Sequence, residues 1–195
     1  MLCYWVASDR LSMHYANSGI LHGGSGLMSK DGIPKPCYYA LYFLSKLQGN
    51  ILKKGDEFIA VQNSNDSIYI LCYNHKEMKE NSINNEDTVV DARNVDSMYD
   101  DTRHIKIKFI LDGLVQGGEY VVKRHMVNQE YGSVMDEWKR LGYEPRMRSN
   151  DIDYLKNVCV PRIQMEHRIA QEGQVQLEAE LKAHEMLLLH VYKCN

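Results

Sequence analysis

The sequence contains no long hydrophobic run. No apolar stretch approaches the roughly 18 residues that a helix needs to cross a bilayer, which excludes a membrane-spanning helix. The first residues lack a basic region leading into an apolar core, so no secretion signal is visible. A strong excess of one charge is also missing, since the net charge at pH 7 is −3. We therefore expect no direct contact with nucleic acid and no attachment to a membrane.

Closely spaced cysteines and histidines are absent as well. The number of cysteines is odd and no two are near each other in sequence: Cys3, Cys37, Cys72, Cys159 and Cys194. This spacing disfavours a disulfide framework or a zinc knuckle and favours free thiols in a reducing cytoplasm. The eight histidines include no His-x-His and no His-x-x-x-His pair. We therefore expect a cytoplasmic protein with no metal site and no cofactor.

Phenylalanine is scarce, with three residues against thirteen tyrosines. Because tyrosine joins an apolar ring to a polar hydroxyl, we expect amphipathic packing surfaces, which occur in sugar-binding proteins and in β-sandwiches alike. The densest aromatic group is Tyr38, Tyr39, Tyr42 and Phe43. This stripe is either a sugar platform or, as helical stripes usually are, the packed face of a helix.

The first 49 residues predict one strand–loop–helix unit. Leu2–Ala7 is apolar and compact, which predicts a buried strand, and the glycine-rich Asn17–Gly26 predicts a loop. Pro34 and Pro36 stand where a helix would begin, since a proline in the first turn loses no helical hydrogen bond. Apolar residues then follow at helical spacing up to Leu47.

From residue 50 to residue 195 the pattern favours short antiparallel strands. His104–Leu111 and Val175–Leu181 alternate most clearly between apolar and polar residues, while Met186–Tyr192 is nearly all apolar and is expected to be a central strand. The acid-rich Asn74–Asp101 is expected to be a long loop. We predict a mainly β fold, an antiparallel β-sandwich in residues 50–195 with short helices, preceded by the separate unit of residues 1–49.

Two short helices are predicted inside this second region. Ser133 is placed to accept an early backbone N–H, and Val134, Trp138 and Leu141 would form the apolar stripe of the first helix. Asp151 is expected to cap the second helix.

The remaining polar clusters have simple structural explanations. The glycine run at residues 23–26 lacks the following Lys-Ser or Lys-Thr of a phosphate-binding loop. His22 beside it is expected to make local hydrogen bonds. Glu178 and Glu180 lie on the polar face of a predicted strand, where acidic side chains are normally solvated.

Several segments together resemble glycoside hydrolase family 39, which contains β-xylosidases. The most specific are Tyr4-Trp5, Ser8-Asp9, His22-Gly23-Gly24-Ser25-Gly26-Leu27-Met28 and Gly32–Leu44, which resemble the last strand, loop and helix of the family's catalytic barrel. Tyr131–Leu141 and Asp153–Pro161 resemble segments of the β-sandwich that follows it. A similar C-terminal region occurs in some AraC-type transcriptional regulators, and the sequence does not choose between the two parents.

The resemblance implies a remnant of a TIM barrel without its catalytic residues. The family's two catalytic glutamates lie on earlier barrel strands, one of them inside an Asn-Glu-Pro motif, and this chain contains no Asn-Glu-Pro. Trp5 stands where the family has a tryptophan that lines the sugar site, so it is the one candidate substrate-binding residue, with simple packing as the alternative. The family's sugar-contacting glutamates would fall near Ser12, Met13 and His14.

Three functional hypotheses follow from the resemblance. The first is a C-terminal accessory domain of a β-xylosidase-like protein, non-catalytic by itself and associated with xylose or xylo-oligosaccharides. The second is a piece of an active retaining β-xylosidase, and the third is the effector or assembly domain of an AraC-type regulator. Because Leu2–Ala7 and the following helix would lack their barrel neighbours, we expect them to pack on the sandwich or to form a homodimer contact.

Overall fold

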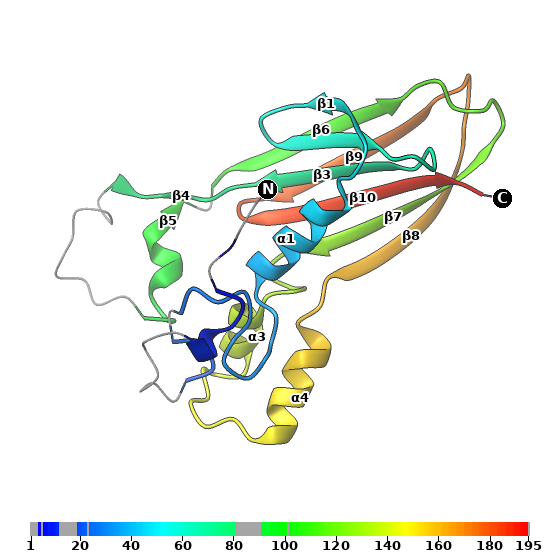
Figure 1. Ribbon diagram of the computed structural model, residues 1–195. Coiled ribbons are helices and arrows are strands. Elements are labelled where there is room, and N and C mark those ends of the chain that lie inside the picture. Colours follow the sequence, from blue (N-terminus) through cyan, green and yellow to red (C-terminus); the bar gives the residue numbers. More distant parts are fainter. Residues whose placement is uncertain are drawn as a thin grey trace. The chain divides into compact units, whose positions relative to one another are not determined.

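The structure is a computed structural model that describes residues 4, 6–11, 19–22, 24–80, 91–100 and 102–194 (Figure 1). Its described part is mainly strands with short helices, which confirms the predicted fold class. The chain forms two compact units. The first combines Met1–Leu41, Lys79–Tyr99 and Val127–Pro161, and the second combines Tyr42–Met78, Asp100–Met126 and Arg162–Asn195. The division predicted at residues 49 and 50 stays a prediction.

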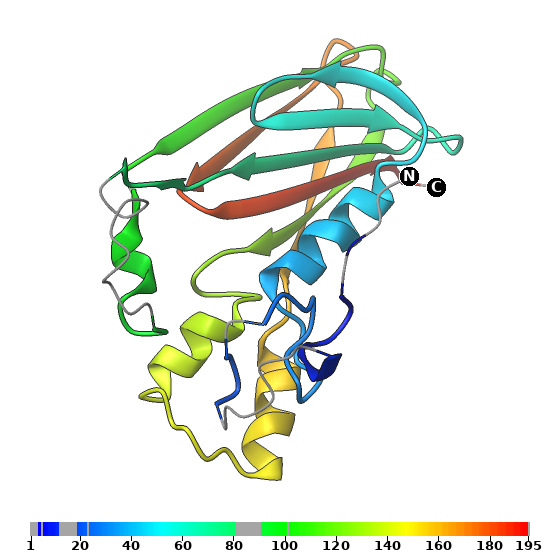
Figure 2. The same cartoon turned by 60° about the vertical axis from the view of Figure 1, so that its left-hand side comes forward.

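The second unit is built on two sheets. The larger sheet has the order β1-β2-β3-β10-β7-β8, with the bounds β1 (Asn50–Lys54), β2 (Phe58–Gln62), β3 (Ile68–Asn74), β10 (Glu185–Lys193), β7 (Glu119–Val127) and β8 (Arg162–Ile169). The smaller sheet pairs β6 (His104–Leu111) with β9 (Val175–Lys182) in antiparallel register. Two views show this pair as a second layer beside the larger sheet (Figures 1 and 2).

The core of the sandwich follows from period-two alternation. Along β9 every second side chain from Val175 to Leu181 is buried, and the residues between them are exposed. Their partners on β6 include Phe109 opposite Leu177, and both side chains belong to one core cluster with Ile70 and Leu189. Because side chains alternate across a strand, this register places all the apolar residues of β9 on one face. The strand β10 lies inside the larger sheet, as its apolar sequence predicted.

The outer face of β6 and β9 carries ion pairs. Glu178 lies 3.2 Å from Lys106 and 3.3 Å from Lys108, and Glu180 lies 3.2 Å from His104. Hydrogen bonds from Lys106 and Lys108 lower the pKa of Glu178. These acids are therefore solvated surface residues, as predicted.

The first unit has a helical core of its own. It contains η1 (Asp9–Leu11), η2 (Val95–Met98), α3 (Val134–Arg140) and α4 (Ser149–Val158), together with the first part of α1 (Pro36–Lys46). Its buried cluster is Ile20, Ile33, Val134, Trp138, Leu155 and Cys159. The helix α1 begins at Pro36, in agreement with the proline signal.

The helix ends agree only in part with the prediction. The hydroxyl of Ser133 accepts the backbone N–H of Asp136 at 3.3 Å, as expected for an N-cap. The predicted cap of α4 was wrong by three residues, because the helix begins at Ser149 and its N-cap is Arg148. Asp151 instead accepts the backbone N–H of Arg148 at 2.9 Å from inside the first turn. Leu141 was also wrongly placed in the apolar stripe, since it is 40% exposed beyond the end of α3.

Two further stretches differ from the prediction. The expected loop Asn74–Asp101 contains, in its described part, the short strands β4 (Glu77–Met78) and β5 (Tyr99–Asp100) as well as η2. The strand expected at Leu2–Ala7 lies partly outside the described residues, and its described members Tyr4, Val6 and Ala7 are not in a strand. The next residue, Ser8, forms an isolated parallel bridge with Met28. A single bridge is not a strand, because a strand needs a row of consecutive residues hydrogen-bonded to a neighbouring strand.

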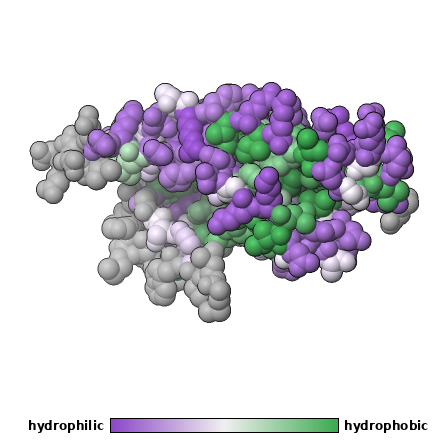
Figure 3. Space-filling model, turned by 90° about the horizontal axis from the view of Figure 1, so that it is seen from above, coloured by the Kyte–Doolittle hydropathy of each residue, from purple (hydrophilic) through white to green (hydrophobic). Residues whose placement is uncertain are grey.

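Apolar side chains remain exposed on both edge strands of the larger sheet. Ile51 is 68% exposed on β1, and on β8 Ile163, Met165 and Ile169 are 57%, 58% and 65% exposed. Seen from above, one face of the molecule carries a patch of apolar side chains bordered by hydrophilic ones (Figure 3). Exposed apolar patches mark surfaces that contact other protein parts.

Candidate functional site

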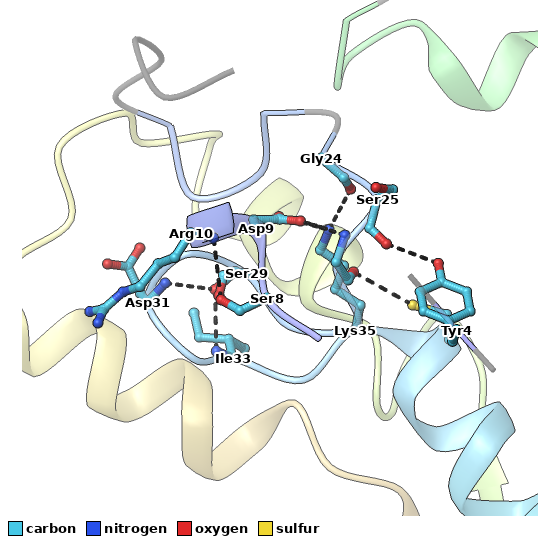
Figure 4. A network of polar contacts seen from close by, with 12 residues as sticks. Tyr4, Ser8, Asp9, Arg10, Gly24, Ser25, Ser29, Asp31, Ile33 and Lys35 are labelled. Carbon is cyan, nitrogen blue, oxygen red and sulfur yellow. Dashed lines mark hydrogen bonds and ion pairs between the residues drawn. The ribbon is translucent and has the colours of Figure 1, made fainter. Parts of the chain in front are cut away.

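A buried ion pair lies at the centre of the loop region in the first unit (Figure 4). The carboxylate of Asp9 is fully buried, and its Oδ2 lies 2.7 Å from Nζ of Lys35, whose side chain is 13% exposed. Oδ1 of Asp9 also accepts the backbone N–H of Gly26 at 2.8 Å, and Lys35 donates to the carbonyl of Gly24 at 2.8 Å. The carboxylate of Asp9 therefore connects its own segment to the glycine loop at residues 24–26 and to Lys35, which directly precedes α1.

Two glycines of the loop are required by close packing against Asp9. A Cβ on Gly24 would lie 2.6 Å from Oδ1 of Asp9, and a Cβ on Gly26 would lie 2.4 Å from its backbone nitrogen. Atoms of this kind cannot approach so closely, so a side chain at either position would displace the ion pair. The glycine run thus serves close approach of the backbone to a buried carboxylate.

Further hydrogen bonds hold the neighbouring residues in place. Nε of Arg10 donates to the carbonyl of Lys30 at 2.7 Å, and the hydroxyl of Tyr4 donates to the carbonyl of Ser25 at 2.9 Å. The hydroxyl of the fully buried Ser29 accepts the backbone N–H of Ile33 at 3.2 Å (Figure 4). Residues on both sides of position 5 are therefore tied to the loop.

The sequence-predicted sugar-site residues fall outside this description. Trp5, Ser12, Met13 and His14 lie outside the described residues, so the role of Trp5 stays a prediction. His22 differs from the expectation of local hydrogen bonding: its Nδ1 is buried and has no hydrogen-bond partner within the described part of the chain. An unpaired buried nitrogen is costly, which makes this atom a potential ligand contact.

The buried cysteines of both units are poorly suited to nucleophilic chemistry. Burial raises the pKa of Cys37, and it raises the pKa of Cys72 and of Cys159 to about 12. Because the thiolate is the reactive form, these three residues stay protonated and inert near neutral pH. These thiols are therefore packing residues, and Cys37 also contacts the carbonyl of Gly26 at 3.9 Å.

The aromatic stripe of α1 is divided between packing and exposure. In the first unit Tyr39 is buried, its hydroxyl donates to the carbonyl of Cys159 at 2.6 Å, and burial raises its pKa to about 12. In the second unit Phe43 is fully buried, with its ring centroid 6.3 Å from that of His125. Tyr38 and Tyr42 are 37% and 42% exposed. Alternate members of the stripe thus pack, as the helix-face interpretation predicts.

The second unit contains a cluster of aromatic rings around a histidine that the sequence did not predict. The rings of Tyr69 and His190 stack with centroids 4.2 Å apart and planes 7° from parallel, and Tyr192 lies beside His190 at 4.8 Å. Tyr69 also lines an open cavity of about 550 Å³, together with Ser45, Lys46, Gln48, Gly49, Asn63, Ser64 and Asn65. The pairing of His190 with Tyr69 depends on the register of β3 and β10, which no local sequence signal shows.

We expect this stack to make the second unit less stable as the pH falls from about 6.5 toward 4. Burial, with help from the charge of Lys123, lowers the pKa of His190 to about 4. Between the two pKa values the unfolded chain binds the proton and the folded chain does not, so stability is complete above about pH 6.5 and is lost toward pH 4, by at most about 3 kcal/mol. Urea unfolding followed by circular dichroism across this range measures the effect.

The variant His190→Phe keeps a ring on Tyr69 and removes the titrating group, so its stability should vary less with pH. His104→Gln, which replaces an exposed histidine of β6, is the matched control and should keep the wild-type pH dependence. A wild-type slope in His190→Phe would show that another group is responsible.

Comparison with known proteins places this architecture in a family. The family model of glycosyl hydrolases family 39 matches residues 1–176. A β-xylosidase of Geobacillus stearothermophilus is 26% identical over 188 residues, which are 96% of this chain and 33% of that protein. An HTH-type transcriptional regulator of Staphylococcus aureus is 23% identical over 83% of this chain and 20% of its own length.

Solved structures share the fold. A monomeric β-xylosidase from Caulobacter crescentus superposes with a TM-score of 0.77 at 18% identity, over 100% of this chain and 38% of that one. This chain thus spans about a third of the length of the β-xylosidases it matches. Within the described residues, no helix is both long and apolar enough to cross a membrane. The family match over residues 1–176 shows that the chain belongs to glycosyl hydrolases family 39 and is a β-xylosidase-like region of it.

Proposed function

We propose that this chain is an accessory C-terminal region of a β-xylosidase-like protein and is not catalytic by itself. The observation that carries the proposal is the state of Asp9, the first carboxylate after Trp5 in the sequence. Asp9 is fully buried and paired with Lys35, so it is not available as a nucleophile or as a proton donor. Retaining glycosidases need two carboxylates about 5–5.5 Å apart across the sugar, and the family's Asn-Glu-Pro motif is missing from this sequence.

The proposed role of the Asp9 loop is to supply part of the wall of a site for xylose or a xylo-oligosaccharide. The hydrogen bond from Tyr4 to Ser25 and the ion pair of Asp9 hold two residues that flank position 5 in sequence, which supports this role. An indole ring packs against sugar C–H groups and offers one N–H to a hydroxyl. The Nδ1 of His22, which has no hydrogen-bond partner among the described residues, supports a polar contact to the sugar.

The proposed role of the sandwich is to support a barrel or a second copy of the chain. The exposed Ile51, Ile163, Met165 and Ile169 on its edge strands are consistent with a surface that another protein part covers. The free Cys37, Cys72, Cys159 and Cys194 are consistent with a reducing, cytoplasmic setting.

The first test is hydrolysis of 4-nitrophenyl β-xyloside. We expect the purified chain to release no more nitrophenol than a heat-denatured sample does, because it contributes no pair of catalytic carboxylates. A complete family 39 β-xylosidase serves as the positive control. Steady turnover that co-purifies with the chain would contradict the non-catalytic role.

The second test is sugar binding, followed by tryptophan fluorescence during titration with xylose and xylobiose. The chain has two tryptophans, and Trp138 is buried with its indole N–H bonded to the carbonyl of Glu144 at 2.9 Å. We expect a fluorescence change that is lost in Trp5→Phe and kept in Trp138→Phe. A change that survives in Trp5→Phe would move the sugar site elsewhere.

A second candidate function is the effector region of a transcriptional regulator, which the similarity to the Staphylococcus aureus protein favours. The reading frame upstream of the codon for Met1 separates the two candidates. An in-frame helix-turn-helix segment without a catalytic barrel favours the regulator, and an in-frame barrel with Asn-Glu-Pro favours the glycosidase.

A further inference from the structure

Three potential metal ligands meet on one face of the larger sheet, at its β10–β7–β8 side. Glu119 begins β7, His167 lies on β8 and Cys194 directly follows β10. His167 pairs with Val121, two residues from Glu119, so the side chains of Glu119 and His167 share a face. The backbone N–H of Cys194 donates to the carbonyl of Glu119 at 2.9 Å, which places the cysteine next to the glutamate.

This face is opposite the sandwich core. Tyr120 and Val122 of β7 and Leu189 and Val191 of β10 point into the core cluster. Because side chains alternate along a strand, Glu119 and Cys194 point away from that core. The side chains of His167 and Glu119 are 59% and 53% exposed, so an ion from solution can reach them.

The ligand atoms converge to within coordination range. One ligand atom from each of Glu119, His167 and Cys194 lies within 4.8 Å of the other two, and Nδ1 of His167 is 2.6 Å from Oε1 of Glu119. In a tetrahedral zinc site, bonds of 2.0–2.3 Å put neighbouring ligand atoms about 3.3–3.7 Å apart. Small rotations of the exposed side chains of Glu119 and His167 would therefore lengthen their 2.6 Å contact and shorten the longest of the three ligand–ligand distances to this range.

We infer that Glu119, His167 and Cys194 form a binding site for a divalent transition-metal ion, Zn²⁺ in particular. A thiolate, an imidazole and a carboxylate are the donor types that Zn²⁺ takes in proteins, and three protein ligands leave the fourth position to water. Binding releases the thiol proton of Cys194 to the solvent, and the carboxylate and thiolate together balance the charge of the ion. The bound ion would tie the end of β10 to β7 and β8.

Cobalt substitution tests the site directly on the whole chain under reducing conditions. Co²⁺ bound to a thiolate has a charge-transfer absorption in the near ultraviolet, and its visible bands report tetrahedral geometry. We expect both signals at one Co²⁺ per chain and expect added Zn²⁺ to remove them. Cys194→Ser should abolish the charge-transfer band, and His167→Gln should weaken Zn²⁺ binding by about tenfold or more in calorimetric titration.

Two control variants separate this site from adventitious binding. His104→Gln removes a histidine that also contacts a glutamate, Glu180 at 3.2 Å, but belongs to no such three-ligand group among the described residues. Cys37→Ser removes another partly exposed thiol. Both should bind Zn²⁺ like the wild type. An unchanged charge-transfer band in Cys194→Ser, or its loss in Cys37→Ser, would overturn the assignment, and so would the absence of any Co²⁺ signal from a folded wild-type chain.

Discussion

Replacing Asp9 with asparagine is expected to destabilise the folded chain by about 3–5 kcal/mol, the cost of removing one partner from a buried ion pair. The asparagine side chain has nearly the same shape, so it leaves no cavity. It does leave the ammonium of Lys35, which is 13% exposed, without its counter-charge. Urea unfolding monitored by circular dichroism measures the free energy of unfolding for each variant.

Asp96→Asn is the matched control for this substitution. Asp96 pairs with Lys139 at 3.4 Å in the same compact unit, but both side chains are about half exposed. An exposed pair contributes at most about 1 kcal/mol, so this variant should unfold nearly like the wild type. Equal effects of the two substitutions would show that the Asp9 pair is solvated and has no special role in the loop.

A double-mutant cycle with Lys35→Met separates the pair from the rest of the loop. If the charge of Lys35 causes the loss, Asp9→Asn should cost much less when Lys35 is already methionine. The remaining cost then reports how much the hydrogen bond from Gly26 weakens when its acceptor loses its charge. Strict additivity of the two substitutions would contradict a direct interaction.

Replacing Gly26 with alanine is expected to destabilise the chain by about 3 kcal/mol, because the new methyl group has no room. Its Cβ would lie 2.4 Å from the backbone nitrogen of Asp9 and 2.6 Å from its Oδ1. One of these atoms belongs to the backbone and the other to the buried ion pair, so neither can move without breaking contacts. The same unfolding measurement gives the size of the effect.

Gly19→Ala is the control, since a Cβ there would meet its nearest atoms at 3.5 Å and 3.8 Å, ordinary contact distances. It should change the free energy of unfolding by less than about 1 kcal/mol. If Gly26→Ala were equally mild, the loop around Asp9 would have to be looser than its contacts indicate.

The sequence by itself determined the long strands of the sandwich, because their signal is local. Alternation along Val175–Leu181 identified the buried face of β9, and Pro36 marked the first turn of α1. The family was also readable from the sequence, because its specific residues lie close together in the segment from His22 to Leu44. The assignment of Trp5 to the sugar site was made in the same way, and it stays a prediction because Trp5 lies outside the described residues.

Only the tertiary structure decided which polar groups act together. Asp9 and Lys35 are separated by 26 positions, and their pairing depends on how the glycine loop folds between them. His190 and Tyr69 stack because of the register of β10 against β3. Glu119, His167 and Cys194 meet because β7 lies between β10 and β8 in the sheet. Such contacts join residues that are distant in sequence. A search for closely spaced histidines and cysteines therefore could not detect these groups.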